Sequence, residues 1–175
     1  CDAGAEYGFY ASDITRTWPT NGRFSKAQRE LYNIVLAAQK ASIAASTLGA
    51  PYEAIHGAAV ETLTGGLLSL GLLKGTLKNA VESQAYRKFY MHKTGHWLGL
   101  DVHDVGEYKL AGASRQLEAG MVFTIEPGLY IASGTPGVPE KYQGIGIRIE
   151  DDILVTKTGN EVLSAQLPTS LCYNS

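Results

Sequence analysis

Hydrophobic and polar positions follow three successive patterns along the chain. Residues 1–6 and 9–18 are rich in β-forming residues on either side of Gly8, and the sequence EYGF around this glycine is typical of a hairpin turn. We therefore predict two antiparallel strands at the start. The middle of the chain then changes to helical spacing, and the last third returns to β-forming runs separated by proline and glycine.

The middle segment predicts three helices. Ser25 is a candidate N-cap for a helix over residues 26–46, where apolar residues recur at helical spacing until Gly49. A second amphipathic helix is predicted over residues 52–72, and a short third helix over residues 77–90.

A glycine-rich loop and three β-forming runs complete the pattern. The loop covers residues 91–106, in which LGLDV (98–102) is compatible with a short strand. Strands are predicted within residues 120–131, 144–156 and 159–164. The order of strands, helices and strands predicts an α+β fold with helices on one face of an antiparallel sheet.

Composition narrows the class of protein. With 175 residues, of which 45% are hydrophobic, the chain fits one globular domain over residues 1–175. The net charge of −2 is spread evenly and the apolar runs are short, so we expect neither a nucleic-acid partner nor a membrane segment. Only Cys1 and Cys172 are present, which favours the cytoplasm. Because the first residues resemble the inside of a strand, we expect the chain to be part of a longer protein.

Five acidic or imidazole residues stand at strand edges or in the glycine-rich loop: Asp2, Asp13, His96, Glu126 and Glu150. The predicted hairpin folds Asp13 back towards Asp2, and two carboxylates held together repel each other unless a cation lies between them. Pro127 and Gly128 fix Glu126 at a strand end. Strand alternation places Glu150 on the face opposite Ile149.

This oxygen-rich set suits divalent ions such as Mn(II), Co(II) or Zn(II). Four carboxylates can share two ions, and a pair of ions supports hydrolysis of an amide bond. Each residue alone has a simpler explanation, as a turn aspartate, a hydrogen-bonded histidine, a loop glutamate or part of a solvated acidic cluster. His56, within the second predicted helix, is interpreted as an ordinary structural histidine.

Four segments together resemble the metallopeptidases of the pita-bread fold, and most closely the Xaa-Pro aminopeptidase (aminopeptidase P) branch. The segments are DAGAEYGFYASDITRTWP, MHKTGHWLGLDVHDVG, AGMVFTIEPGLYI and GIGIRIEDDILVT, in this order, within residues 2–156. The resemblance implies a curved antiparallel sheet with helices on its outer face. It also implies that the first part of this fold and an N-terminal domain lie upstream of Cys1.

The resemblance assigns roles to individual residues. Asp2 is expected to chelate one metal, Asp13 and Glu150 to bridge both, and His96 and Glu126 to complete the shell of the other. The family usually carries two manganese ions, although cobalt or zinc also fits.

Further roles concern the substrate. His92 and His103 match positions that line the pocket and hydrogen-bond the scissile peptide and the proline side. Arg148 matches an arginine beside the bridging glutamate. Glu126 is expected to be the general base and acid. The expected reaction is hydrolysis of the bond between an N-terminal residue and a following proline.

Three alternatives remain beside this reading. A prolidase, which cleaves Xaa-Pro dipeptides, shares every ligand, and HWLGLDVHD favours aminopeptidase P over it. A methionine aminopeptidase fits the loop around His96 less well. A non-catalytic peptide-binding module of the same fold would be expected to have lost ligands, whereas all five are present here. The expected partner is a peptide with proline in second position, and the intact protein is expected to be a homo-oligomer.

Overall fold

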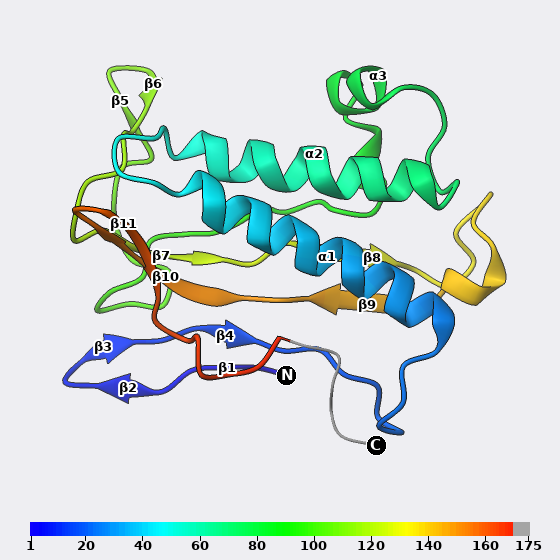
Figure 1. The fold of residues 1–175 in the computed structure, drawn as a ribbon, viewed down its shortest axis with the longest axis horizontal. Helices are drawn as coiled ribbons and strands as arrows, with labels where there is room; N and C mark the ends of the chain where they lie inside the picture. The colour runs from blue at the N-terminus through cyan, green and yellow to red at the C-terminus, as the bar shows by residue number, and fades with distance from the viewer. Residues whose placement is uncertain (170–175) are drawn as a thin grey trace.

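A computed structural model describes residues 1–169 of the chain (Figure 1). Cys172 lies outside the described residues, and Cys1 is an exposed free thiol. The predicted N-terminal hairpin is confirmed, although its pairing is divided into two short ladders. Its strands are β1 (Asp2–Ala3), β2 (Glu6–Tyr7), β3 (Tyr10–Ala11) and β4 (Ile14–Thr15).

The hairpin turns at Gly8 and Phe9, between paired Tyr7 and Tyr10. Both turn residues have positive φ angles, 57° for Gly8 and 70° for Phe9. A two-residue loop with two positive φ angles matches the twist of the flanking strands. β2 pairs with β3 and β1 pairs with β4 in one continuous register, which places Asp2 opposite Thr15.

Helix α1 (Lys26–Ala45) begins as predicted. Ser25 accepts a hydrogen bond from the backbone N–H of Gln28, and the Gln28 side chain accepts one from the backbone N–H of Ser25, which forms a capping box. Helix α2 (Glu53–Ser69) runs beside α1 in Figure 1 and ends three residues earlier than predicted.

The third predicted helix is wrong as a single element. It divides into α3 (Leu77–Glu82) and a 3₁₀ helix, η1 (Ala85–Lys88). Between them Gln84 has a φ of 55°, which interrupts the right-handed helix.

The last third forms antiparallel strands, as predicted, but each long run is interrupted. Residues 120–131 contain β7 (Val122–Ile125) and β8 (Gly128–Ile131), and residues 144–156 contain β9 (Ile145–Arg148) and β10 (Asp151–Thr156). β8 pairs with β9 and β7 with β10. The register is unchanged across the interruption, because Gly128 faces Arg148 and Ile125 faces Asp151.

Three further elements surround this ribbon. β11 (Gly159–Val162) pairs with β10, as expected for the last β-forming run. The short hairpin of β5 (Lys109–Leu110) and β6 (Ala113–Ser114) was not predicted, and neither was the 3₁₀ helix η2 (Glu140–Tyr142).

The glycine-rich loop of residues 91–106, called the histidine loop below, is extended along β7. The backbone N–H groups of Leu98, Thr124 and Glu126 donate to Val122, His96 and Thr94 respectively, which is the pattern of an antiparallel pairing. Within the described part of the chain, residues 98–102 form no strand, and Trp97 instead makes a single bridge to Phe123. The loop therefore continues the sheet beyond β7.

The core lies between the two long helices and the ribbon β7–β10. One cluster joins Leu31 and Val35 of α1 and Leu63 of α2 to Ile147 and Ile149. A second cluster packs Ile55 of α2 against Phe123, Ile125 and Ile153. Because neighbouring strand positions point to opposite faces, this packing leaves Arg148 and Glu150 on the face away from the helices. No helix in residues 1–169 is long and apolar enough to span a membrane.

Candidate metal centre

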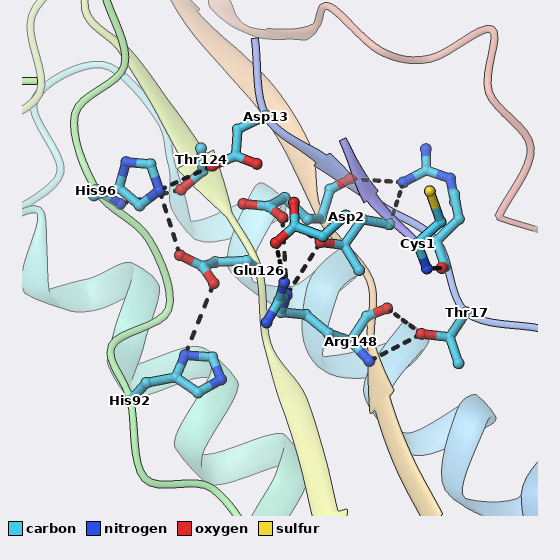
Figure 2. A network of polar contacts seen from close by, with 12 residues as sticks. Cys1, Asp2, Asp13, Thr17, His92, His96, Thr124, Glu126 and Arg148 are labelled. Carbon is cyan, nitrogen blue, oxygen red and sulfur yellow. Dashed lines mark hydrogen bonds and ion pairs between the residues drawn. The ribbon is translucent and has the colours of Figure 1, made fainter. Parts of the chain in front are cut away.

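The five predicted ligands come from adjacent lengths of extended chain that lie side by side. The histidine loop runs along β7, β7 is paired with β10, β10 contacts β4, and β4 is paired with β1. These lengths carry, in the same order, His96, Glu126, Glu150, Asp13 and Asp2. Segments up to 148 residues apart therefore bring the five side chains to one place. Figure 2 shows four of them, Asp2, Asp13, His96 and Glu126.

His96 is held with one ring nitrogen directed at the carboxylates. Its Nδ1 lies 3.0 Å from the carbonyl oxygen of Trp97, which can only accept, so Nδ1 carries the proton. The other ring nitrogen, Nε2, lies 3.4 Å from an oxygen of Asp13 and 3.6 Å from an oxygen of Glu126. This is the arrangement in which a backbone carbonyl fixes the tautomer of a metal-ligating histidine.

Glu126 and Glu150 face each other where the ribbon is interrupted. The unchanged register on both sides of the interruption places Glu126 opposite Glu150. Pro127 has no N–H and cannot extend the pairing of β7, while the N–H of Glu150 turns to the carbonyl of Thr15 in β4. Burial raises the pKa of Glu126 to about 7 and that of Glu150 to about 8.

Asp2 and Asp13 approach each other diagonally across the hairpin. Since Asp2 faces Thr15, Asp13 is the next residue on the same face of β4. Burial and then the nearby Asp2 raise the pKa of Asp13. The backbone N–H of Asp13 donates to the carboxylate of Asp152 at 3.3 Å, which fixes the chain at this ligand.

Thr15 and Arg148 connect the carboxylates from outside the cluster. The buried Thr15 hydroxyl donates to Glu150 at 2.5 Å and accepts from Nε of Arg148 at 3.1 Å. Arg148 also forms an ion pair with Asp2. The expected position of Arg148 beside Glu150 is thus observed, and the same guanidinium reaches Asp2.

The donor set fits divalent metal ions. Three groups of side chains have ligand atoms within 4.8 Å of one another in the described residues: Asp13–His96–His103, His96–Glu126–Glu150 and Asp2–Asp13–Glu150. Overlapping groups that share residues are the geometry that two neighbouring ions require. Because burial and mutual repulsion make the ionised carboxylates costly, a divalent cation placed among them offsets both penalties.

His92 and His103 lie next to different ligands of the cluster. The ring of the exposed His103 is 4.2 Å from that of His96, close enough for His103 to belong to one candidate metal group. His92 lies 3.9 Å from Glu126, so Glu126 stands between His92 and His96 (Figure 2).

Both ring nitrogens of His92 have partners. Nδ1 donates to the carbonyl of Lys93 at 2.7 Å, and Nε2 therefore accepts from the hydroxyl of Tyr130 at 2.8 Å. Burial lowers the pKa of His92, which favours this neutral form.

The cluster opens into a cavity of about 730 Å³, the size of a pocket for a small ligand. His56, interpreted from the sequence as an ordinary structural histidine, lies in the wall of this cavity. Its Nδ1 is 2.8 Å from the hydroxyl of buried Thr94, which is 2.7 Å from the hydroxyl of Tyr90. The sequence carries no signal for this position, because the helical pattern does not show which side of α2 meets the histidine loop.

Comparison with known proteins identifies the fold. A family model described as metallopeptidase family M24 matches residues 1–157. A Xaa-Pro aminopeptidase of Haemophilus influenzae is 51% identical over 172 residues, which are 97% of this chain and 39% of that protein. A Xaa-Pro aminopeptidase of Escherichia coli is 53% identical over 166 residues, which are 95% of this chain and 37% of that protein.

Solved structures agree with these relatives. Pseudomonas aeruginosa aminopeptidase PepP matches with a TM-score of 0.96 and 50% identity, over 97% of this chain and 38% of that one. Zinc-substituted E. coli aminopeptidase P in complex with product matches with a TM-score of 0.92 and 52% identity, over the same shares of the two chains. The expected α+β pita-bread fold is confirmed, and the chain spans under two fifths of the length of these proteins.

Proposed function

Because the chain belongs to metallopeptidase family M24, we propose that the protein removes the N-terminal residue from peptides whose second residue is proline. The observation that carries this proposal is the convergence of Asp2, Asp13, His96, Glu126 and Glu150 on one cavity, with all five of the expected ligands present. The relatives named Xaa-Pro aminopeptidase, about 50% identical over nearly the whole chain, support the choice of substrate.

The five residues would hold two divalent ions, with Asp13 and Glu150 shared between them. When bound, such ions supply positive charge that activates water and polarises the scissile carbonyl. Thr15 and Arg148 keep Glu150 and Asp2 in place by hydrogen bond and ion pair. We propose manganese as the natural metal because the donors are mainly oxygen, with cobalt or zinc as substitutes.

Glu126 would move the protons of the reaction. Burial raises the pKa of Glu126 to about 7 in the metal-free fold, and a carboxylate placed beside the attacking water can accept a proton and later release it. It would take a proton from the attacking water and give it to the departing prolyl nitrogen. That nitrogen belongs to a tertiary amide without an N–H, so it needs a delivered proton before the bond can break.

His103 and His92 would contact the substrate on the two sides of Glu126. His103 is exposed beside His96, where its N–H groups can stabilise negative charge that develops on the carbonyl oxygen. His92 would line the proline side. Because its two nitrogens are engaged by Lys93 and Tyr130, we propose that it acts on the peptide together with the Tyr130 hydroxyl.

The test of Glu126 is the variant Glu126→Gln in the natural-length protein, loaded with manganese. We expect hydrolysis of a Xaa-Pro-Yaa tripeptide to fall by at least about 100-fold, the usual contribution of a general base, with an unchanged circular dichroism spectrum. Glu161→Gln, an exposed glutamate on β11, is the matched control and should retain full activity. Activity retained in Glu126→Gln would remove this residue from the mechanism.

Prolidase activity is the second candidate, since a prolidase would use the same ligands. A manganese-dependent assay that compares a Xaa-Pro dipeptide with a Xaa-Pro-Yaa tripeptide separates the two enzymes, and we expect the tripeptide to be preferred. A protein that takes up no metal and loses nothing to a chelator would instead favour a non-catalytic peptide-binding module.

Three further features belong to the same proposal. We propose a single domain over residues 1–175, a cytoplasmic location because cysteine is scarce, and a homo-oligomer because, among residues 1–169, β1 pairs with β4 alone. The even charge distribution, with no basic run, supports a peptide rather than a nucleic acid as the partner.

A further inference from the structure

A second, smaller cavity adjoins the metal centre. It measures about 250 Å³ and has His56, His92 and Lys93 in its wall, as the large cavity does, so the two cavities border on the same three residues. Arg87 of η1 and Tyr90 also line the smaller cavity. We call this smaller cavity, with Lys93 and Arg87 at its wall, the basic annex.

The two cations of the basic annex have no acidic partner. In residues 1–169, no carboxylate oxygen lies within 4.0 Å of the side-chain nitrogens of Lys93 or Arg87, and Arg87 donates only to the neutral side chain of Gln84. Lys109, which also lines the large cavity, differs because it is paired with Glu53 at 3.3 Å.

The charges of Lys93 and Arg87 act on His56, a residue in the wall of both cavities. The pKa of His56 is lowered to about 4, first by burial and then by the charge of Lys93, with a smaller effect of Arg87. An imidazole in the wall of both cavities therefore senses both cations. The same field would attract an anionic group entering from the metal centre.

The basic annex lies on a defined side of the reacting centre. Glu126 stands between His96 and His92 (Figure 2), and the annex adjoins His92. Asp13 lies on the other side, next to His96. A peptide that extends from Glu126 past His92 would thus leave the carboxylate-lined end of the cavity and arrive between two unpaired cations.

We propose that the basic annex binds the C-terminal carboxylate of a short peptide substrate. An unmodified peptide always carries this negative charge downstream of the bond to be cut, whereas its side chains vary. A carboxylate held by Lys93 and Arg87 would direct the amino end of the peptide towards the metal ligands, as removal of the N-terminal residue requires. This inference rests on the proposed function and extends it to short peptides with a free C-terminus.

The test uses the natural-length, manganese-loaded protein and two substrates, Xaa-Pro-Ala and its C-terminal amide. We expect kcat/KM to be higher for the free acid, through a lower KM at equal kcat, since the carboxylate is bound equally before and during the reaction. Lys93→Gln and Arg87→Gln should each reduce this preference roughly two- to fivefold, as expected for exposed ion pairs. The preference should also weaken as salt is raised from about 0.01 to 0.5 M.

Lys74→Gln is the matched control. It removes one exposed lysine beyond the C-terminal end of α2 that lines neither the large cavity nor the basic annex. The control should keep the wild-type preference. Equal rates for acid and amide, or a preference that survives the double variant of Lys93 and Arg87, would overturn this inference alone. No hydrolysis of either substrate would overturn the proposed function as well.

Discussion

At the scale of single residues, the metal centre depends on side chains that hold the ligands. Thr15 shows this most directly, because its one hydroxyl donates to Glu150 and accepts from Arg148. A valine of nearly the same shape would leave both partners without that bond, so its effect reports the hydrogen bonds rather than the packing.

We therefore expect Thr15→Val to weaken manganese binding by about 10- to 100-fold, the usual effect of losing a group that orients a metal ligand. Isothermal titration calorimetry on the metal-free protein measures this directly. Thr62→Val is the matched control, because Thr62 bonds only the carbonyl of Ala58 within α2. Unchanged affinity in Thr15→Val would show that Glu150 is held without the hydroxyl.

His56 predicts a pH dependence of stability. Its pKa is about 4 in the folded protein, chiefly because of burial, against an ordinary value of 6.5. Folding therefore favours the neutral ring. The stability that depends on a neutral His56 is complete above pH 6.5 and is lost as the pH falls from 6.5 towards 4.

The measurement is urea unfolding of wild type and His56→Gln at pH 7.5 and 4.5, both with chelator. From pH 7.5 to 4.5, wild type should lose roughly 1–2 kcal/mol more than the variant, a value reduced from the full shift because His56 is only partly buried. The carboxylates of the metal centre contribute equally to both proteins and cancel. If wild type and His56→Gln lost the same stability between pH 7.5 and 4.5, the lowered pKa of His56 would be contradicted.

At the scale of elements, the pairing of the histidine loop with β7 could not be predicted. The sequence places Glu126 at a strand end and His96 in a glycine-rich loop, and the glycines of this loop indicate irregular structure. The glycine at position 95 is explained by steric contact rather than by irregular structure. A Cβ atom there would lie 1.8 Å from the backbone oxygen of Thr124, so glycine is required by the close approach of the two chains.

Gly95→Ala should therefore disturb the loop. We expect a loss of at least about 2 kcal/mol of stability, as for other core overpacking, together with loss of the metal affinity that His96 provides. Gly57→Ala in α2 is the matched control. Apart from the helix's own backbone and the two neighbouring residues, no atom of the described chain lies within 4 Å of a Cβ at Gly57, and the helix should gain about 0.5–1 kcal/mol. Chemical denaturation measures the free energy of unfolding of both variants. A Gly95→Ala variant that is as stable as wild type and binds metal would contradict the steric argument.

Other elements follow from the sequence to different degrees. The N-cap at Ser25 and the alternation of Ile147 and Ile149 with Arg148 are local patterns, and both are observed. The interruption at Gln84 was missed because a left-handed glutamine leaves no mark in a helical pattern. The role of Glu150 as a link between two ladders depends on its hydrogen bond to Thr15, which is distant in sequence.

At the scale of the whole molecule, the metal centre couples folding to metal binding. The ligands come from both ends of the described chain, between Asp2 and Glu150, so bound metal would connect the N-terminal hairpin to the central ribbon. Without metal, the pKa values of Glu126 and Glu150 are raised by burial to about 7 and about 8, against ordinary values of 4.5. In this state the fold favours the protonated carboxyls.

These pKa values determine whether the stability of the metal-free protein rises or falls with pH. For both groups, the contribution to stability is complete below pH 4.5 and is lost as the pH rises through about 7 and 8. We expect the metal-free, natural-length protein to melt at a lower temperature at pH 8 than at pH 6. Manganese requires the ionised carboxylates, so it should bind more tightly at pH 8 and stabilise the protein more there.

Differential scanning calorimetry at pH 6 and pH 8, with chelator or with manganese at about 100 times its dissociation constant at pH 8, tests this coupling. The expected gain at pH 8 is about 3 kcal/mol for each bound ion, seen as a higher melting temperature, and a clearly smaller gain is expected at pH 6. Glu150→Gln removes one of the two titrating groups and should reduce both the pH dependence and the metal gain, while Glu161→Gln should change neither. A manganese gain of the same size at both pH values would show that the carboxylates are already ionised in the metal-free fold, and that burial does not hold them protonated.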